Sequence, residues 1–169
     1  NYDYIGLINS LKADSNVHID TANNIENISV FLDLSRKINT IFLSTSSALF
    51  KNYYRGDIGG FFALFKDFCH SIVLKENRGG SRALKYSEGN IISVPSQTQP
   101  VAHSVGVGDA FVSSYVFLHM KFDFETSLFY SSWIATEYAL TTFIDDFRHG
   151  CQATLKLAPE EIKNLGGTI

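Results

Sequence analysis

Apolar residues along this chain recur with two different periods, and the alternation between them predicts the elements of the fold. Segments with apolar positions three and four residues apart are typical of helices, and short apolar runs bounded by polar turns are typical of buried strands. The predicted helices are Tyr4–Lys12, Ile25–Ile38, Ser46–Tyr53, Ile58–Phe68, a long helix beginning at Gly108, and Glu125–Phe143. The predicted strands are Asn16–Ile19, Thr40–Leu43, Ser71–Leu74, Ser81–Tyr86 and Asn90–Val94.

The order of these elements predicts an α/β fold. The first three strands alternate with helices, which is typical of a parallel sheet covered by helices on both faces. The last two strands flank a short turn, Ser87–Gly89, and form a hairpin that adds antiparallel strands at one edge. Asp57 is predicted to cap the helix that starts at Ile58.

Composition and charge exclude several classes of function. Apolar residues make up 45% of the 169, and the net charge of −3 with a pI near 5.9 provides no basic field for nucleic acid. No run reaches the roughly 18–20 apolar residues of a membrane span, and no signal peptide is visible. Cys69 and Cys151 lie far apart, which favours free thiols in a reducing cytoplasm. No histidine has metal-ligand spacing, so no metal site is assigned.

The run Val105–Phe111 is the most informative stretch for function. Gly106 and Gly108 indicate a turn that feeds the N-terminus of a helix, where exposed N–H groups and the helix dipole favour a phosphate or another oxyanion. A carboxylate at Asp109 would be repelled by that anion, and it suits the removal of a proton from an attacking hydroxyl. The stretch therefore predicts phosphoryl transfer to an alcohol. The alternative is an ordinary tight turn with a helix-capping aspartate.

The same stretch resembles the G-A-G-D signature of the ribokinase-like (PfkB-type) carbohydrate kinases. Three further segments resemble family strands in the same order and at similar spacing. Val17–Asn23 resembles the strand that usually ends D-x-N, Thr40–Ser44 the strand that leads into N-x-x-E, and Ile72–Ser81 the strand and turn V-x-(T/K)-x-G-x-x-G. Together the four motifs extend over most of the chain, whereas a lone G-x-G-D would be a weak signal.

This resemblance implies a role for each candidate residue. Asp109 is the expected catalytic base, and the N–H groups of Gly106, Val107 and Gly108 form the expected anion hole. Further residues are expected beside the nucleotide: Lys75, Asn77 and Gly80 in the turn, and Thr136, Ala139 and Leu140 as an apolar wall to adenine. The alternatives are a solvated turn at Lys75–Arg78 and an ordinary helix core face at Thr136 and Ala139.

The resemblance also implies what the chain belongs to. Family members are about twice as long, so residues 1–169 are expected to be a single α/β domain, the C-terminal nucleotide-binding portion of a longer, ATP-dependent sugar kinase in the cytoplasm. The expected ligands are ATP, Mg²⁺ and a sugar. The oligomeric state stays open, with a homodimer of the full-length protein as one option. Neither nucleic acid nor membrane is expected as a partner, and the sequence does not name the sugar.

Two departures from the family pattern keep a second function open. Ser44–Ser47 stands where N-x-x-E would help to organise Mg²⁺ and phosphate. His103-Ser104 stands where Asp-Thr would help to bind a monovalent cation, and histidine is a poor ligand for K⁺, so the sequence gives no support for K⁺ activation. The alternative function is therefore a catalytically impaired nucleotide-binding or phosphate-binding module of the same fold.

Overall fold

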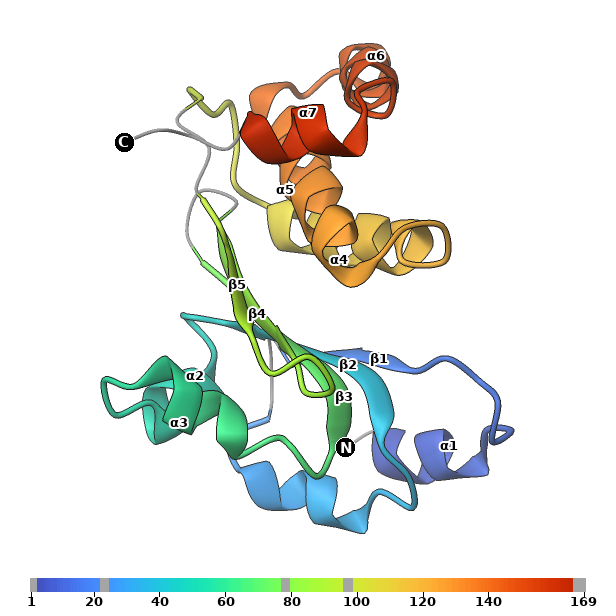
Figure 1. The fold of residues 1–169 in the computed structure, drawn as a ribbon, viewed down its shortest axis with the longest axis vertical. Coiled ribbons are helices and arrows are strands. Elements are labelled where there is room, and N and C mark those ends of the chain that lie inside the picture. Colours follow the sequence, from blue (N-terminus) through green and yellow to red (C-terminus); the bar gives the residue numbers. More distant parts are fainter. Residues whose placement is uncertain (1–2, 22–24, 77–79, 96–98, 166–169) are drawn as a thin grey trace. The chain divides into compact units, whose positions relative to one another are not determined.

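A computed structural model describes residues 3–21, 25–76, 80–95 and 99–165 (Figure 1). The helices are α1 (Tyr4–Ser10), the 3₁₀ helix η1 (Ile28–Asp33), α2 (Ala48–Tyr53), α3 (Ile58–Ala63), α4 (Val107–Leu118), α5 (Phe124–Leu140), α6 (Ile144–Thr154) and α7 (Pro159–Asn164). The strands are β1 (His18–Asp20), β2 (Ile38–Ser44), β3 (Cys69–Lys75), β4 (Ser81–Lys85) and β5 (Ile91–Val94).

The five strands form one mixed sheet in the order β1-β2-β3-β4-β5. β1 and β2 are parallel, with His18 opposite Thr40. β3 and β4 run in opposite directions, because Tyr86 N–H donates to His70 O near one end and Glu76 N–H donates to Gly80 O at the other. The predicted hairpin of β4 and β5 is confirmed as neighbouring strands, and so is the α/β class.

The chain divides into two compact units, which are described separately. Unit 1 comprises Asn1–Leu74 and Ala83–Ile91, and unit 2 comprises Lys75–Arg82 and Ile92–Ile169. The expectation that residues 1–169 form a single domain stays a prediction.

Unit 1 has an aromatic core between its helices and the sheet. Phe31 meets Phe65 edge to face at 6.2 Å, and Phe61 meets Phe65 at 5.4 Å, the offset geometries that aromatic rings prefer. In the middle of β2, Ile41, Phe42 and Leu43 are all fully buried. Consecutive buried residues of this kind are typical of a strand that is covered on both faces.

The predicted helix over Ile25–Ile38 is wrong. The structure forms only the 3₁₀ helix η1, in which Phe31 is the sole buried residue and Leu32 is 70% exposed. Between the buried ends Ile25 and Ile38 only Phe31 is buried, so packing does not support a long helix over the whole segment. Ile38 instead begins β2, where its N–H donates to Phe68 O at 2.9 Å.

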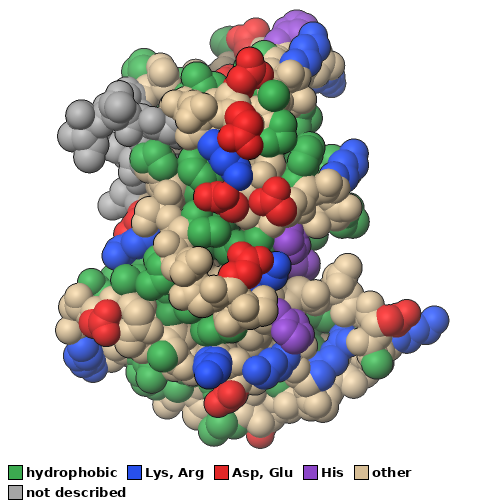
Figure 2. All heavy atoms as spheres, in the orientation of Figure 1, with side chains coloured by type: hydrophobic (Ala, Val, Ile, Leu, Met, Phe, Trp, Pro, Cys, Tyr) green, Lys and Arg blue, Asp and Glu red, His purple; other side chains and the backbone are tan. Residues whose placement is uncertain are grey.

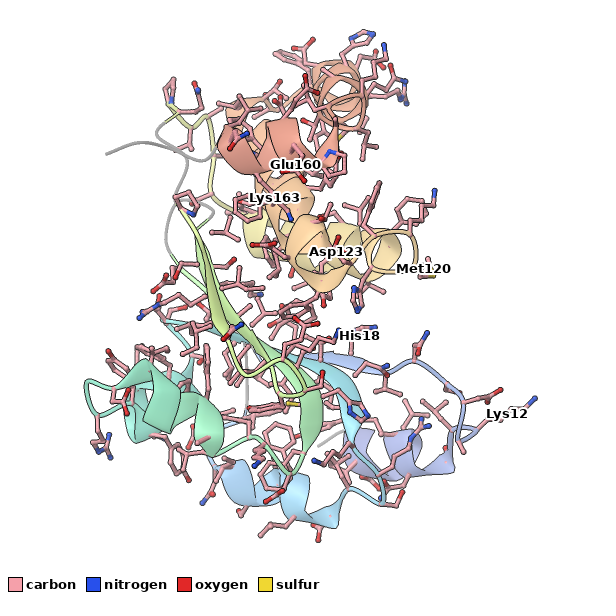
Figure 3. All side chains as sticks on the ribbon, viewed as in Figure 1. Lys12, His18, Met120, Asp123, Glu160 and Lys163 are labelled. Atoms are coloured by element: carbon pink, nitrogen blue, oxygen red, sulfur yellow. The ribbon has the colours of Figure 1, made fainter. Side chains whose placement is uncertain are left out.

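Unit 2 is a helical assembly built around α5. α4, α6 and α7 all pack on this helix, and residues on every side of α5 are buried. Asp123 caps α5 by accepting hydrogen bonds from the Thr126 N–H at 2.8 Å and the Thr126 hydroxyl at 2.7 Å. Lys163 of α7 donates to Glu125 at 2.7 Å, which ties α7 to the first turn of α5 (Figure 3).

The second long helix ends earlier than predicted, and two further helices follow it. α5 stops at Leu140 rather than Phe143, because Thr141 is extended and its hydroxyl accepts the N–H of Phe143. The sequence analysis predicted neither α6 nor α7. α7 begins at Pro159, where the Glu161 side chain accepts the N–H of Ala158 at 2.6 Å.

The two cysteines are free thiols, and side chains of both charges occur on the surface. Cys69 and Cys151 are not bonded to each other, and burial raises the pKa of the Cys69 thiol to about 12, so it stays protonated. On the face drawn in Figure 2, acidic and basic side chains are interspersed rather than gathered by sign. None of the helices in the described part of the chain is long and apolar enough to cross a membrane.

Candidate functional site

The start of α4 is a glycine turn with an open helix end. Gly106 is the N-cap and adopts φ 80° and ψ −4°, a left-handed conformation in which a side chain costs roughly 1–2 kcal/mol. The first intrahelical hydrogen bond runs from Ala110 N–H to Gly106 O at 2.8 Å. The N–H groups of Val107, Gly108 and Asp109 therefore have no acceptor within the helix, and no side chain of the described residues caps them. These three donors face outward at the positive end of a twelve-residue helix.

Asp109 lies in the first turn of α4, two residues after the first helical residue. Its side chain is exposed, and no acceptor or donor among the described residues is bonded to its carboxylate. The backbone carbonyl of Asp109 accepts the Ser113 hydroxyl at 2.7 Å, so the residue is held by the helix while its carboxylate remains available. An exposed, uncommitted carboxylate beside an oxyanion turn can accept a proton from a hydroxyl brought to that turn.

Lys75 lies beside this turn. It is the last residue of β3, and its Nζ is 3.3 Å from the position that a Cβ on Gly108 would occupy. Gly108 thus leaves room for a cation next to the open N–H groups. Gly80 is buried, and its carbonyl oxygen accepts the N–H of Glu76. This hydrogen bond joins the residue after β3 to the residue before β4. Asn77 lies outside the described residues.

Tyr138 of α5 lies on the other side of the turn and was not among the residues that the sequence indicated. Its hydroxyl oxygen is 2.8 Å from the position that a Cβ on Gly106 would take. A side chain at Gly106 would therefore collide with Tyr138 as well as strain the backbone. Helical periodicity places Tyr138 on α5, but it gives no sign that the hydroxyl reaches a turn about thirty residues earlier.

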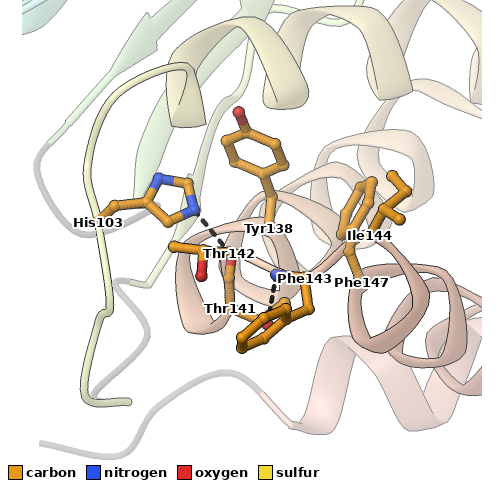
Figure 4. Close-up of a pocket in the computed structure, with 7 residues that line it drawn as sticks. All are labelled: His103, Tyr138, Thr141, Thr142, Phe143, Ile144 and Phe147. Atoms are coloured by element: carbon orange, nitrogen blue, oxygen red, sulfur yellow. Dashed lines mark hydrogen bonds between the residues drawn. The ribbon is translucent and has the colours of Figure 1, made fainter.

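A pocket of about 260 Å³ opens next to Tyr138 (Figure 4). It lies where the loop before α4 meets the end of α5 and the start of α6. His103 spans the pocket, since its Nε2 is 2.9 Å from Thr141 O and its ring meets Tyr138 edge to face at 4.9 Å. The lining residues are His103, Tyr138, Thr141, Thr142, Phe143, Ile144 and Phe147. The pocket is thus largely aromatic, with a few polar groups at its margin.

Thr136 and Ala139 are buried within unit 2 and do not line this pocket. The Thr136 hydroxyl donates to Ser132 O at 2.9 Å, and Ala139 O accepts the N–H of Ala102 at 2.7 Å. Ala139 therefore holds the loop that carries His103, whereas Tyr138 of α5 and the residues that follow the helix from Thr141 line the pocket. Nucleotide contacts by Thr136 and Ala139 stay a prediction.

The serine-rich segment after β2 forms local hydrogen bonds in unit 1. The hydroxyls of Ser44 and Ser46 are 2.7 Å apart, and Ser47 caps α2 by accepting the N–H of Phe50 at 3.3 Å. These hydroxyls contribute no charge. No group of three or more histidine, cysteine, aspartate or glutamate side chains that could hold a metal gathers among the described residues.

Glu137, next to Tyr138 on α5, is a partly buried carboxylate that packs against α6. Its Oε2 is only 2.2 Å from the place of a Cβ on Gly150, so the glycine makes room for it. Burial raises the pKa of Glu137. Burial also raises the pKa of the Cys151 thiol, and the Glu137 charge adds to that rise. Glu137 of α5 thus packs against Gly150 and lies near Cys151 of α6.

Comparison with known proteins identifies the fold. No protein-family model and no curated protein sequence matches the chain. Among solved structures, ribokinase of Thermotoga maritima is similar with a TM-score of 0.68, at 12% identity, over 91% of this chain and 52% of that one. Arabidopsis thaliana ribokinase complexed with ribose and ATP gives 0.63, at 15% identity, over 85% and 48%. Phosphofructokinase-2 of Escherichia coli gives 0.63, at 14% identity, over 83% and 48%.

The fold is that of the ribokinase-like kinases. The predicted resemblance is thereby confirmed at the level of fold, for most of this chain. The chain spans about half the length of the solved structures that it matches. The activity, the substrates and the partners of the whole protein are therefore proposals.

Proposed function

We propose that this chain provides the nucleotide side of an ATP-dependent kinase that phosphorylates a hydroxyl of a carbohydrate. The observation that carries the proposal is the open start of α4, where three N–H groups that have no acceptor among the described residues lie beside the Lys75 ammonium and the Asp109 carboxylate. Donors and a cation suit a transferring phosphoryl group, and a carboxylate suits the proton of the attacking alcohol. The ribokinase-like fold supports the same reaction class by analogy.

The reaction requires one proton transfer and one displacement. The oxygen of the sugar hydroxyl forms a bond to the γ-phosphorus of ATP, and the bond between that phosphorus and the β–γ bridging oxygen breaks. ADP leaves with the bonding electrons, and the proton of the hydroxyl passes to the Asp109 carboxylate. Positioning of the acceptor and the phosphate supplies most of the rate in such reactions.

The protein's donors would stabilise the charge on the transferring group. The N–H groups of Val107, Gly108 and Asp109 are fixed by the helix, so they need no reorganisation when charge develops. The Lys75 ammonium adds a full positive charge on the Gly108 side. Mg²⁺ would arrive with the nucleotide, because this ion is usually held by substrate phosphates with one or two carboxylates.

The aromatic pocket would take the base of the nucleotide. Tyr138 borders both the pocket and the turn, so a ligand in the pocket would have its phosphates directed toward the start of α4. The rings of His103, Tyr138 and Phe147 offer faces and edges that suit a flat heterocycle. We propose this pocket as the adenine side of the site. Thr136 and Ala139 do not line it, and contacts of these two residues with adenine stay a prediction.

The test is ADP release by the full-length protein with ATP, Mg²⁺ and a panel of sugars, nucleosides and sugar phosphates. Turnover that depends on one class of acceptor, with a phosphorylated product identified by mass, is the expected result. A folded full-length protein that binds ATP but phosphorylates no member of the panel would contradict the kinase proposal.

A second function, a nucleotide-binding or phosphate-binding module without turnover, is favoured by the segment Ser44–Ser47. The hydroxyls of Ser44, Ser46 and Ser47 are taken up by local hydrogen bonds and by the cap of α2, and no side chain of the segment bears a charge for a hydrated cation. The two functions differ in their response to Mg²⁺. A catalytic site is expected to bind ATP more tightly with Mg²⁺, whereas a relic phosphate pocket is expected to bind ATP equally with and without it.

A further inference from the structure

Tyr138 places a hydroxyl directly against the residue that opens α4. Its oxygen is 2.8 Å from the place of a Cβ on Gly106, and its Cε1 and Cζ are 3.3 and 3.4 Å from the same point. Gly106 is the left-handed N-cap from which the open N–H groups follow. The end of the phenol ring therefore lies at the edge of the oxyanion turn.

The ring of Tyr138 is held in place on two sides. His103 meets it edge to face at 4.9 Å, and Phe147 of α6 meets it at 5.4 Å with an interplanar angle of 83°. His103 is itself held by hydrogen-bonding distances to the carbonyl oxygens of Val105 and Thr141. Because packing already restricts the ring, little side-chain entropy remains to be lost when a ligand meets its hydroxyl.

The Tyr138 hydroxyl has no protein partner in the described part of the chain, in contrast to the hydroxyls of Tyr130 and Tyr86. The hydroxyl of Tyr130 donates to Leu157 O at 2.5 Å, and that of Tyr86 donates to Phe62 O at 2.6 Å. Tyrosine hydroxyls that lie close to other groups usually find such an acceptor. The Tyr138 hydroxyl points away from the other residues of the aromatic pocket (Figure 4), toward the side on which Gly106 lies.

We propose that the Tyr138 hydroxyl donates a hydrogen bond to the phosphate that is held at the start of α4. This proposal rests on the proposed function, and it adds a binding residue to that site. Two side chains then flank the turn at its two glycines, the neutral phenol of Tyr138 at Gly106 and the ammonium of Lys75 at Gly108. A side chain at Gly106 would collide with the Tyr138 hydroxyl, and one at Gly108 would come within 3.3 Å of the Lys75 Nζ.

In the same geometry, Tyr138 would contact both the base and the phosphates of a bound nucleotide. Its ring borders the aromatic pocket and its hydroxyl borders the turn, so a nucleotide would meet the same side chain at both ends. Loss of the hydroxyl is expected to weaken binding of any polyphosphate. Loss of the ring is expected to weaken binding of the base as well.

The test compares two substitutions that remove the same atom from the same helix. Tyr138→Phe removes the hydroxyl at the turn, and Tyr130→Phe removes a hydroxyl that is used inside unit 2. Calorimetric titration of the full-length protein with ATP and with tripolyphosphate measures both affinities, and thermal unfolding without ligand measures stability.

We expect Tyr138→Phe to weaken both ligands about tenfold, the loss typical of one hydrogen bond to a charged group, with unchanged stability. Tyr130→Phe is expected to lower stability and leave both affinities unchanged. Unchanged affinity in Tyr138→Phe, with a wild-type protein that binds ATP, would overturn this inference alone. A folded wild-type protein that binds neither ATP nor tripolyphosphate would overturn the proposed function as well.

Discussion

Two helices of this chain begin with glycines and an aspartate, yet their N-termini are built in opposite ways. In α3 the aspartate comes first: Asp57 is the N-cap, and its carboxylate accepts the N–H groups of Gly59 at 3.0 Å and Gly60 at 2.9 Å. In α4 the aspartate comes third among the helical residues, and a glycine is the N-cap. Within the described part of the chain no side chain caps α4, so its first N–H groups stay open.

The comparison shows that the order of the residues decides what a helix N-terminus does. An aspartate before the first turn satisfies the free N–H groups and stabilises the fold. An aspartate within the first turn leaves those groups to a ligand and adds a carboxylate near it. The start of α3 is thus a structural device, and the start of α4 is suited to hold an anion. The predictions below separate these two roles.

The largest effect is expected from Asp109→Asn. The change keeps the size of the side chain and removes its ability to accept a proton, so phosphoryl transfer by the full-length protein is expected to fall about 10²- to 10⁴-fold. ATP affinity is expected to stay the same or to rise, because a negative charge near the phosphates is lost. Steady-state ADP release and calorimetry measure the two quantities. Equal turnover in both proteins would mean that another residue is the base.

Gly106→Ala is expected to disturb both the backbone and the site. The alanine would be strained at φ 80°, and its Cβ would meet the Tyr138 hydroxyl at 2.8 Å. Gly89→Ala is the matched control, because Gly89 has φ 75° and open space around its Cβ position. The control is expected to lose roughly 1–2 kcal/mol of unfolding free energy from strain alone. Gly106→Ala is expected to lose more than this and to weaken ATP binding, as denaturant unfolding and calorimetry would show.

Asp57→Ala is expected to lower stability without touching the candidate site. It removes the carboxylate that caps α3, a loss of about 1–2 kcal/mol in the free energy of unfolding. ATP affinity measured on the folded protein is expected to stay at the wild-type value. A loss of ATP affinity equal to that of the Gly106 variant would break the distinction between the two helix starts.

Asp123, the cap of α5, is expected to give a stability that depends on pH. Burial alone would raise the pKa of this carboxyl, but hydrogen bonds from Thr126 and the charge of Lys163 hold the pKa below its ordinary value. A lowered pKa in the folded state means that the contribution is present above the unfolded-state pKa and is lost as the pH falls through the folded-state pKa. Asp123→Ala is therefore expected to cost about 1 kcal/mol at neutral pH. The difference from wild type should shrink below about pH 4, which thermal unfolding across pH would measure.

The smallest effect is expected from Glu137→Gln. Burial raises the pKa of Glu137, so the folded protein binds this proton more tightly than the unfolded chain does. Wild-type stability is then expected to fall as the pH rises through the unfolded-state pKa toward the folded-state pKa. The glutamine variant should lack this dependence and unfold at a slightly higher temperature at neutral pH. A lower unfolding temperature would indicate that the Glu137 charge has a partner.

The parts of the fold that follow from local patterns were predictable. The strands β2 and β3 appear as short apolar runs, Asp57 has the position of a cap, and the glycine turn before α4 has a distinct composition. The segment Ile25–Ile38 was not predictable in this way, because its apolar spacing is helical while only Phe31 is buried between its two buried ends, Ile25 and Ile38. Whether the segment forms a long helix or a short 3₁₀ helix depends on its packing against the core, and the spacing of apolar residues does not report that packing.

The candidate site was predictable only where its residues share one segment. Gly106, Val107, Gly108 and Asp109 are consecutive, and the order of their side chains already indicates an open helix end. Tyr138 and the aromatic pocket depend on how α5 and α6 pack beside the loop at His103, and no spacing in the sequence reports those contacts. Thr136 and Ala139 are buried within unit 2, and their predicted contacts with the nucleotide stay a prediction.

The most direct test of the central claim is a titration of the full-length protein with ATP, followed by the backbone amide signals in nuclear magnetic resonance. The account predicts saturable shifts at the amides of Val107, Gly108 and Asp109, where the N–H groups are open. It predicts no change at Gly59 and Gly60, whose N–H groups are held by Asp57. Saturable binding of ATP that leaves the three amides of α4 unmoved would contradict the claim that this helix start is the oxyanion site.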